Sequence, residues 1–162
     1  MTATVVFASA FTFAPTEDRD LIRMVVTHPA VYKHVSDDFS PPPEEYEPHP
    51  GMQYVSVWDK GELLGMWIFQ PHNAVCYEVH TCLLPCAWGE RGQRAAREMA
   101  HWIFAHTPCK RIITNVPVSN RLALRFARAA GMTEFGVNKR SIAKGGQLED
   151  QILLGLSPEE VQ

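Results

Sequence analysis

Glu78 and His80 are the ionisable side chains whose types and spacing best suit proton-transfer chemistry. They lie in residues 76–82, CYEVHTC, a segment whose Val, Tyr and Thr content predicts a β-strand. Successive side chains of a strand point to opposite faces, so Glu78 and His80 share one face with Cys76 and Cys82. A carboxylate and an imidazole on one face can serve as general bases, directly or through a water. The alternatives are a solvated or paired carboxylate and a hydrogen-bonded histidine at a strand end.

The stretch that follows, PCAWGERGQ at residues 85–93, joins this strand to an amphipathic helix. A helix leaves the N–H groups of its first turn without partners, and its dipole places partial positive charge there. Gly89 and Gly92 allow an anion to approach the backbone closely. The turn is therefore predicted to bind an anion such as a phosphate.

Composition restricts the class of protein. The chain has 162 residues, of which 46% are hydrophobic and 20% charged, so we predict a single globular domain over residues 1–162. A formal net charge of -3 argues against a general nucleic-acid binder. The sequence has no apolar run of ~18 residues and its start lacks a basic segment, so we expect no membrane association and a cytoplasmic location.

The four cysteines and two nearby histidines raise the question of a zinc site. Structural zinc sites usually contain paired CxxC knuckles, and this sequence has none. We therefore predict no metal, and no disulfide in a chain without a secretion signal. The residues concerned are His72, Cys76, His80, Cys82, Cys86 and Cys109.

The remaining pattern predicts a mixed α/β fold in the order β-α-α-β-β-β-α-β-α-β-β. Helices are expected to end near residues 26, 35, 106 and 130, where Pro or Gly follows. The first strand is expected to end at Pro15. The strands are predicted at residues 4–13, 52–58, 63–70, 74–84, 111–116, 134–143 and 148–156.

Residues 36–51, SDDFSPPPEEYEPHPG, are too rich in proline and carboxylates for regular structure. This long loop is either a solvated connector or a mobile wall of a substrate pocket. Its acidic side chains would suit a cationic amine. They are Asp37, Asp38, Glu44, Glu45 and Glu47.

A family resemblance rests on the segment after residue 111. A strand ending at Asn115 is followed by NRLALRFARAAGM, with Asn120, Ala123 and Gly131 at the spacing of an Asn-x-x-Ala-x-x-x-Tyr-x-x-x-Gly-Phe motif. The chain thereby resembles the GCN5-related N-acetyltransferase (GNAT) superfamily over nearly its full length. The resemblance implies an acyl-CoA N-acyltransferase fold, with a central mixed, mostly antiparallel sheet of about seven strands flanked by about four helices.

The same resemblance implies where acetyl-CoA lies. The strands at residues 74–84 and 111–116 are expected to splay apart and hold the coenzyme between them, with a backbone N–H near Cys82 or Leu83 stabilising the oxyanion. Glu78 and His80 become the catalytic candidates, with Glu78 preferred. The coenzyme contacts expected are Cys82, Leu83, Leu84, Trp88, Gly89, Arg91, Gly92, Gln93, Arg94, Ala95, Asn115, Asn120 and Phe126.

Two positions depart from the family pattern. Arg94 stands where the second glycine of the phosphate-binding turn is expected, and an alternative register uses Trp88-Gly89. Ala127 replaces the tyrosine that many members use to protonate the leaving thiolate, a role for which His80, Tyr77 or Ser119 could substitute.

The sequence therefore predicts an acetyl-CoA-dependent N-acetyltransferase acting on a primary amine of a small molecule or a protein. The alternative is a catalytically degenerate protein of the same fold that binds coenzyme A or other proteins. The acceptor amine is not specified by the sequence, and the closing strands could pair two subunits into a homodimer.

Overall fold

The computed structural model describes residues 10–162, which form one seven-stranded sheet in the order β1-β2-β3-β4-β5-β7-β6. Neighbouring strands are antiparallel except β4 and β5, which are parallel. The predicted mixed, mostly antiparallel sheet is confirmed. The strands are β1 (Thr12–Thr16), β2 (Gln53–Asp59), β3 (Glu62–Pro71), β4 (Cys76–Leu83), β5 (Arg111–Pro117), β6 (Thr133–Lys144) and β7 (Gln147–Leu156).

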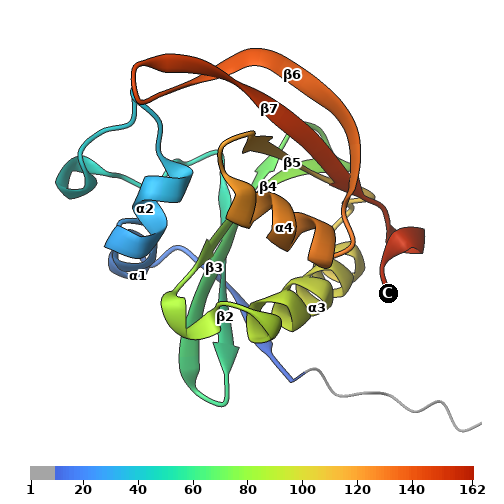
Figure 1. The fold of residues 1–162 in the computed structure, drawn as a ribbon. Helices are drawn as coiled ribbons and strands as arrows, with labels where there is room; N and C mark the ends of the chain where they lie inside the picture. Colours follow the sequence, from blue (N-terminus) through green and yellow to red (C-terminus); the bar gives the residue numbers. More distant parts are fainter. Residues whose placement is uncertain (1–9) are drawn as a thin grey trace, which may run out of the picture.

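Four α-helices flank this sheet in the predicted order (Figure 1). They are α1 (Arg19–Val26), α2 (Pro29–Val35), α3 (Glu90–His106) and α4 (Arg121–Ala129). Three short 3₁₀ turns are η1 (Pro43–Glu45), η2 (Pro85–Ala87) and η3 (Pro158–Glu160). The hairpin of β6 and β7 arches over the upper side of the molecule towards the segment that follows α2 (Figure 1).

The hydrophobic core has two main parts, one on each face of the sheet. Ile22 and Val25 of α1 pack with Met66, Ile68 and other β3 and β4 residues on one face. The buried side of α3 packs on the opposite face against β2, β3 and β4. Side chains of β4 therefore alternate between two covered faces, as their period of two requires.

The first strand lies later in the chain than predicted. Residues 12 and 13 are the only part of the predicted strand 4–13 that falls in β1, while residues 1–9 lie outside the described part. Pro15 does not end the strand but lies within it, opposite Val55. A proline is tolerated there because, within the described residues 10–162, β1 is a sheet edge paired with β2 alone, so an N–H can be missing on the open side.

Local sequence signals explain the main boundaries. Asp18 accepts bonds from the amides of Asp20 and Leu21 and so begins α1. Asn120 caps α4 by accepting from the amide of Ala123 at 3.1 Å. These two caps fix where α1 and α4 begin.

Candidate active site

The strands β4 and β5 pair over only a short distance. Their register runs from Cys76 opposite Arg111 to Glu78 opposite Ile113, and then stops. Beyond that point β4 stays paired with β3 up to Leu83, while β5 stays paired with β7. The two strands therefore separate at Glu78, and the predicted splay is present.

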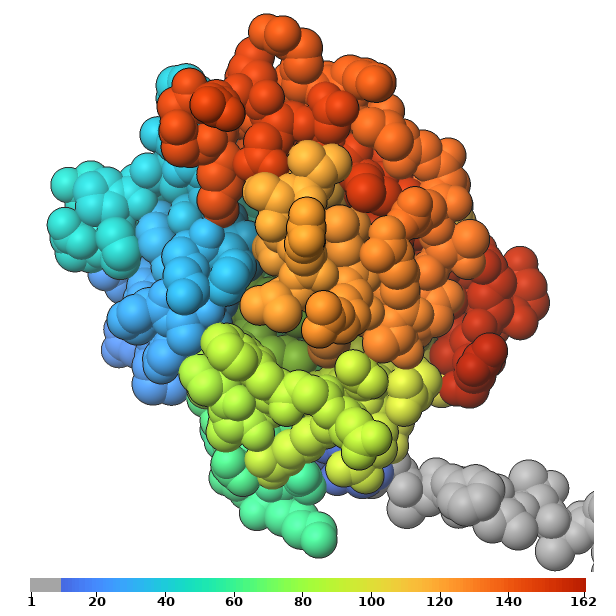
Figure 2. All heavy atoms as spheres, in the orientation of Figure 1, coloured from blue at the N-terminus to red at the C-terminus, as the bar shows by residue number. Residues whose placement is uncertain are grey.

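A cavity of about 620 Å³ occupies this separation and continues between α2, α3 and α4. Its opening appears as a hollow between the blue surface of α2, the light-green start of α3 and the orange α4 (Figure 2). Both catalytic candidates line it. The coenzyme candidates that line it are Leu83, Trp88, Gly89, Gln93, Asn115, Asn120 and Phe126, and those that do not are Cys82, Leu84, Arg91, Gly92, Arg94 and Ala95.

The pairing of β4 directs alternate backbone groups into the cavity. Alternate residues of an antiparallel strand bond to the same neighbour, and the amide of Leu84 donates to the carbonyl of Leu64 at 2.8 Å. The amide of Cys82 is therefore directed towards β3, whereas that of Leu83 is directed to the side that β5 has left. Of the two amides expected to meet an oxyanion, the Leu83 amide has the suitable direction.

The N-terminus of α3 lies at the other end of this cavity. Gly89 precedes the helix with a φ of 88°, and no side chain among the described residues caps the helix start. The helical bonds begin with Gln93 N donating to Gly89 O at 3.1 Å. The three preceding amides therefore have no intrahelical partner, which is the arrangement that binds anions at helix N-termini.

Gly92 belongs to this helix start for a packing reason. A Cβ at this position would lie 2.5 Å from the carbonyl oxygen of Ala87 and 3.0 Å from Leu83 Cδ1. The glycine thus lets the first turn of α3 lie directly against η2. Its role is to set the position of the backbone amides, since its own Cα does not line the cavity.

The two arginines of the turn point to other partners. The guanidinium of Arg91 lies 3.0 Å from Asp59 and 2.8 Å from Glu62, and these carboxylates raise its pKa. The guanidinium of Arg94 lies 5.9 Å from the ring centroid of Phe11. Neither side chain lines the cavity.

Glu78 is the centre of a polar network at the point where the strands separate. Its Oε1 accepts from Asn115 Nδ2 at 2.9 Å, and its Oε2 lies 2.9 Å from His72 Nε2. His80 Nε2 lies 3.8 Å from Oε1, and the Glu78 side chain is 14% exposed. Asn115, expected only as a coenzyme contact, thus orients the carboxylate.

His80 borders both the network and the cavity. Burial lowers the pKa of its imidazole, because the charged form loses hydration, and the nearby Glu78 carboxylate partly opposes this shift. The ring is therefore neutral near pH 7 and has a nitrogen lone pair available to accept a proton.

No tyrosine replaces the one that the family pattern places at position 127. Ala127 lines the cavity with a buried methyl group. Tyr77 is buried in the core beside Phe69, and Ser119 donates to Glu149 at 2.9 Å. Of the three substitutes considered, His80 is the one that lines the cavity.

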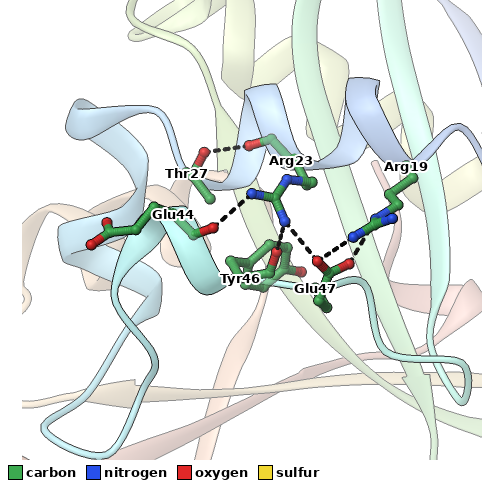
Figure 3. A network of polar contacts seen from close by, with 6 residues as sticks. All are labelled: Arg19, Arg23, Thr27, Glu44, Tyr46 and Glu47. Atoms are coloured by element: carbon green, nitrogen blue, oxygen red, sulfur yellow. Dashed lines mark hydrogen bonds and ion pairs between the residues drawn. The ribbon is translucent and has the colours of Figure 1, made fainter.

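The proline-rich loop at residues 36–51 is held against α1 by polar contacts. Arg19 binds Glu47, and Arg23 lies 2.9 Å from Glu47 and donates to the carbonyl oxygens of Glu44 and Tyr46 (Figure 3). Partner arginines therefore occupy Glu47 and reduce its value as a cation site.

Asp38 has a structural role as well. Its two carboxylate oxygens accept from the amides of Gly145 and Gly146, each at 2.8 Å. Lys144 Nζ donates to the carbonyl oxygens of Lys33 and Ser36 at 2.8 Å. These bonds tie the start of the loop to the tip of the β6–β7 hairpin, above the cavity. Of the loop's five acidic residues, Asp37 is the one that lines the cavity.

Two parts of the site were not expected from the sequence. Ala30, Val31, His34 and Val35 of α2 line the cavity, and His72 contacts Glu78 from the β3–β4 connection. Within residues 10–162 there is no cluster of three or more His, Cys, Asp or Glu side chains arranged for a metal ion. No helix of this part is both long and apolar enough to cross a membrane.

Comparisons with known proteins agree with this architecture. The family described as "Protein of unknown function (DUF2824)" matches residues 14–154, and no curated protein sequence matches the chain. Among solved structures, the chain is similar to a spermidine N-acetyltransferase from Vibrio cholerae in complex with CoA and spermine. The alignment of the two chains has a TM-score of 0.76 at 15% identity and covers 95% of this chain and 99% of the other.

Two further solved structures show the same fold. A ribosomal-protein-S5-alanine acetyltransferase from Vibrio fischeri gives a TM-score of 0.71 at 17% identity, covering 96% of this chain and 97% of the other. A GNAT-family acetyltransferase from Bacillus anthracis gives 0.71 at 18% identity, covering 95% and 98%. The predicted GNAT fold is confirmed.

Proposed function

We propose that this chain, which belongs to the DUF2824 family, is an acetyl-CoA-dependent N-acetyltransferase that acts on a primary amine. The observation that carries the proposal is the separation of β4 from β5 at Glu78. It brings a partly buried carboxylate, unpaired strand amides and a helix N-terminus to one cavity. In acyl transfer from a thioester to an amine, the carboxylate would accept the amine proton and a strand amide would stabilise the oxyanion. The helix N-terminus would bind the phosphates of the coenzyme.

The coenzyme would lie along the open edge of β4. Amides at the start of α3 suit its pyrophosphate, and the gap between β4 and β5 suits an extended chain bearing the thioester. The cavity walls there are largely apolar, with Met99, Ile112 and Phe126 among them. A solved structure of the same fold contains CoA, which supports CoA as the ligand.

Glu78 would remove the proton that the acceptor ammonium must lose before it attacks. The amine nitrogen then forms a bond to the thioester carbonyl carbon, the Leu83 amide stabilises the oxyanion, and the C–S bond breaks. His80, neutral and 3.8 Å from the carboxylate, is the second candidate for the base. The leaving thiol has a pKa of roughly 8.5, so a thiolate can depart without a tyrosine to protonate it.

Acetyl-CoA binding and amine-dependent thiol release together test this function. Acetyl-CoA should raise the Tm of the protein, because a ligand that binds only the native state stabilises it. Spermidine and a peptide that begins with alanine are suitable acceptor probes, since structures of this fold include a spermidine N-acetyltransferase and a ribosomal-protein-S5-alanine acetyltransferase. The proposal fails if saturating acetyl-CoA leaves the Tm unchanged.

A second candidate is a coenzyme-binding protein without transferase activity. Ala127, at the position of the expected general acid, favours it. This candidate predicts a Tm increase with acetyl-CoA but no thiol release with any amine. It also predicts that Glu78→Gln changes neither measurement.

The homodimer and the cytoplasmic location stay predictions. In the part of the chain that the structure describes, β6 is a sheet edge paired with β7 alone, and Phe135 and Val137 on it are half-exposed. A dimer formed there would add a strand pair to the sheet. Sedimentation analysis of Val137→Lys against the unaltered protein would test it.

A further inference from the structure

His72 connects the Glu78 carboxylate to the protein surface. It follows β3 directly, its side chain is 42% exposed, and it does not line the cavity. Its Nε2 lies 2.9 Å from Glu78 Oε2, whereas Oε1 faces Asn115 and His80, which do line the cavity. The carboxylate therefore bridges two environments, with one oxygen towards the cavity and one towards an exposed imidazole.

A base in this position needs an exit for its proton. Glu78 is 14% exposed, and its cavity side would be covered by both reactants during turnover. A carboxyl group that stayed protonated could not accept a proton from the next acceptor amine. Exchange through the oxygen that faces away from the reactants would reset the base without opening the cavity.

We propose that His72 is the proton-relay residue of this site, acting through Glu78 and connecting it to solvent. The inference rests on the proposed acetyltransferase function. In the relay, the acceptor N–H bond breaks and an O–H bond forms on Glu78. The carboxyl then turns this O–H towards His72 and gives the proton to Nε2 of the Nδ1–H tautomer, forming an imidazolium that releases its Nδ1 proton to water. Exchange of the Nε2 proton with solvent restores the starting tautomer.

The surrounding bonds show that the imidazole is not needed to build the turn. The backbone amide of His72 donates to Cys76 O at 2.9 Å, and Asn73 Oδ1 accepts from the amides of Val75 and Cys76, both at 3.0 Å. Asn115 independently orients Glu78 from the cavity side. Replacing the His72 side chain should therefore leave the turn and one carboxylate contact in place.

Two variants at this position separate a relay from a purely orienting contact. His72→Gln keeps an N–H donor that can reach the carboxylate but cannot pass a proton. His72→Ala leaves an exposed space that imidazole from the buffer can enter. His101→Ala, an exposed histidine on α3 away from the cavity, is the matched control.

The relay predicts that kcat for amine-dependent thiol release falls about 10²-fold in both variants, at the lower end of the usual loss for a proton-transfer group. The KM for acetyl-CoA should not change. Added imidazole should restore kcat of His72→Ala in a concentration-dependent manner and should have no effect on His72→Gln or His101→Ala.

Other results would overturn the relay. Full activity of His72→Gln would show that His72 only orients Glu78. Full activity of His72→Ala would show that His72 has no role in turnover. A loss in His72→Ala that imidazole does not restore would also contradict it. If the unaltered protein binds no acetyl-CoA or releases no thiol, the proposed function fails and the relay with it, whereas normal turnover by the variants refutes the relay alone.

Discussion

The two ends of the cavity differ in which atoms form them. At the α3 end the groups directed to the cavity are backbone amides, placed by Gly89 and by the close contact of Gly92 with η2. At the other end they are the side chains of Glu78 and His80, of which Glu78 is held by Asn115 of β5 and by His72. A site formed by backbone amides tolerates substitution of the side chains around it. A site formed by side chains depends on each residue that holds those side chains in position.

This difference explains why the departures from the family pattern have unequal consequences. Arg94 replaces an expected glycine, yet its side chain points to Phe11 and leaves the helix start open. Ala127, in contrast, removes a functional group from the cavity, and no other residue considered for that role reaches it except His80. Five substitutions would test the contrast.

Glu78→Gln should have the largest effect, because it removes the proposed base while preserving shape and the Asn115 contact. We expect kcat for thiol release to fall by about 10²- to 10⁴-fold. The increase in Tm with acetyl-CoA should be unchanged, since the coenzyme is held at the other end. An unchanged kcat would contradict the assignment, and His101→Ala again serves as the control.

Gly92→Ala should disturb the backbone end. The added methyl group would lie 2.5 Å from Ala87 O, so the start of α3 must shift. Overpacking of this kind costs about 1–3 kcal/mol in the free energy of unfolding, and the shifted amides should bind acetyl-CoA more weakly. Gly136→Ala is the matched control, because its methyl group would meet Leu153 at an ordinary 3.4 Å. Equal coenzyme affinity in the two variants would argue against the backbone site.

Asp38→Ala should weaken binding of the acceptor amine without changing binding of acetyl-CoA. Two amide bonds to the hairpin tip are lost, and we expect the free energy of unfolding to fall by about 1 kcal/mol. The KM for the acceptor should rise while the KM for acetyl-CoA stays constant. Glu45→Gln, in the same loop, controls for the lost charge. Parallel changes in both KM values would show that the two ends are not independent.

His80 should make stability depend on pH. Burial lowers its folded pKa below the ordinary 6.5, so under acidic conditions the unfolded chain binds more protons than the folded one. The His80 contribution is therefore constant above pH 6.5, and stability is lost as the pH falls from there through the folded pKa. Urea unfolding at pH 7.5 and 5.5 should show a smaller decrease for His80→Gln than for the unaltered protein. Identical decreases would show that His80 is not desolvated.

Arg94→Ala should have the smallest effect. If the coenzyme phosphates are held by amides, removal of this side chain should change the free energy of acetyl-CoA binding by less than about 0.5 kcal/mol. Calorimetric titration measures the change directly. A loss of tenfold or more in affinity would show that the guanidinium turns from Phe11 to the phosphates.

Sequence reasoning succeeded where the signal was local. Alternation placed Glu78 and His80 on one strand face, and the Asn120 and Gly131 signals bounded α4. It failed where distant segments meet. Pro15 stays within a strand because that strand is an edge, which no local pattern reveals.

Contacts between distant segments also determine which charged side chains are available to a substrate. The loop carboxylates looked available to a cationic substrate, but Glu47 pairs with arginines of α1 and Asp38 with the β6–β7 turn. His72 was considered only as a metal ligand, because its contact with Glu78 depends on the path of the β3–β4 connection. Residue types suggest which groups can react, and only the packed fold shows which remain available.

A crystal structure with bound CoA would test the central claim most directly. We expect the pyrophosphate within hydrogen-bond distance of the amides of residues 90–92, the pantetheine chain between β4 and β5, and the sulfur close to Leu83 and Glu78. Coenzyme bound outside the gap between β4 and β5, or with its sulfur remote from Glu78, would contradict it.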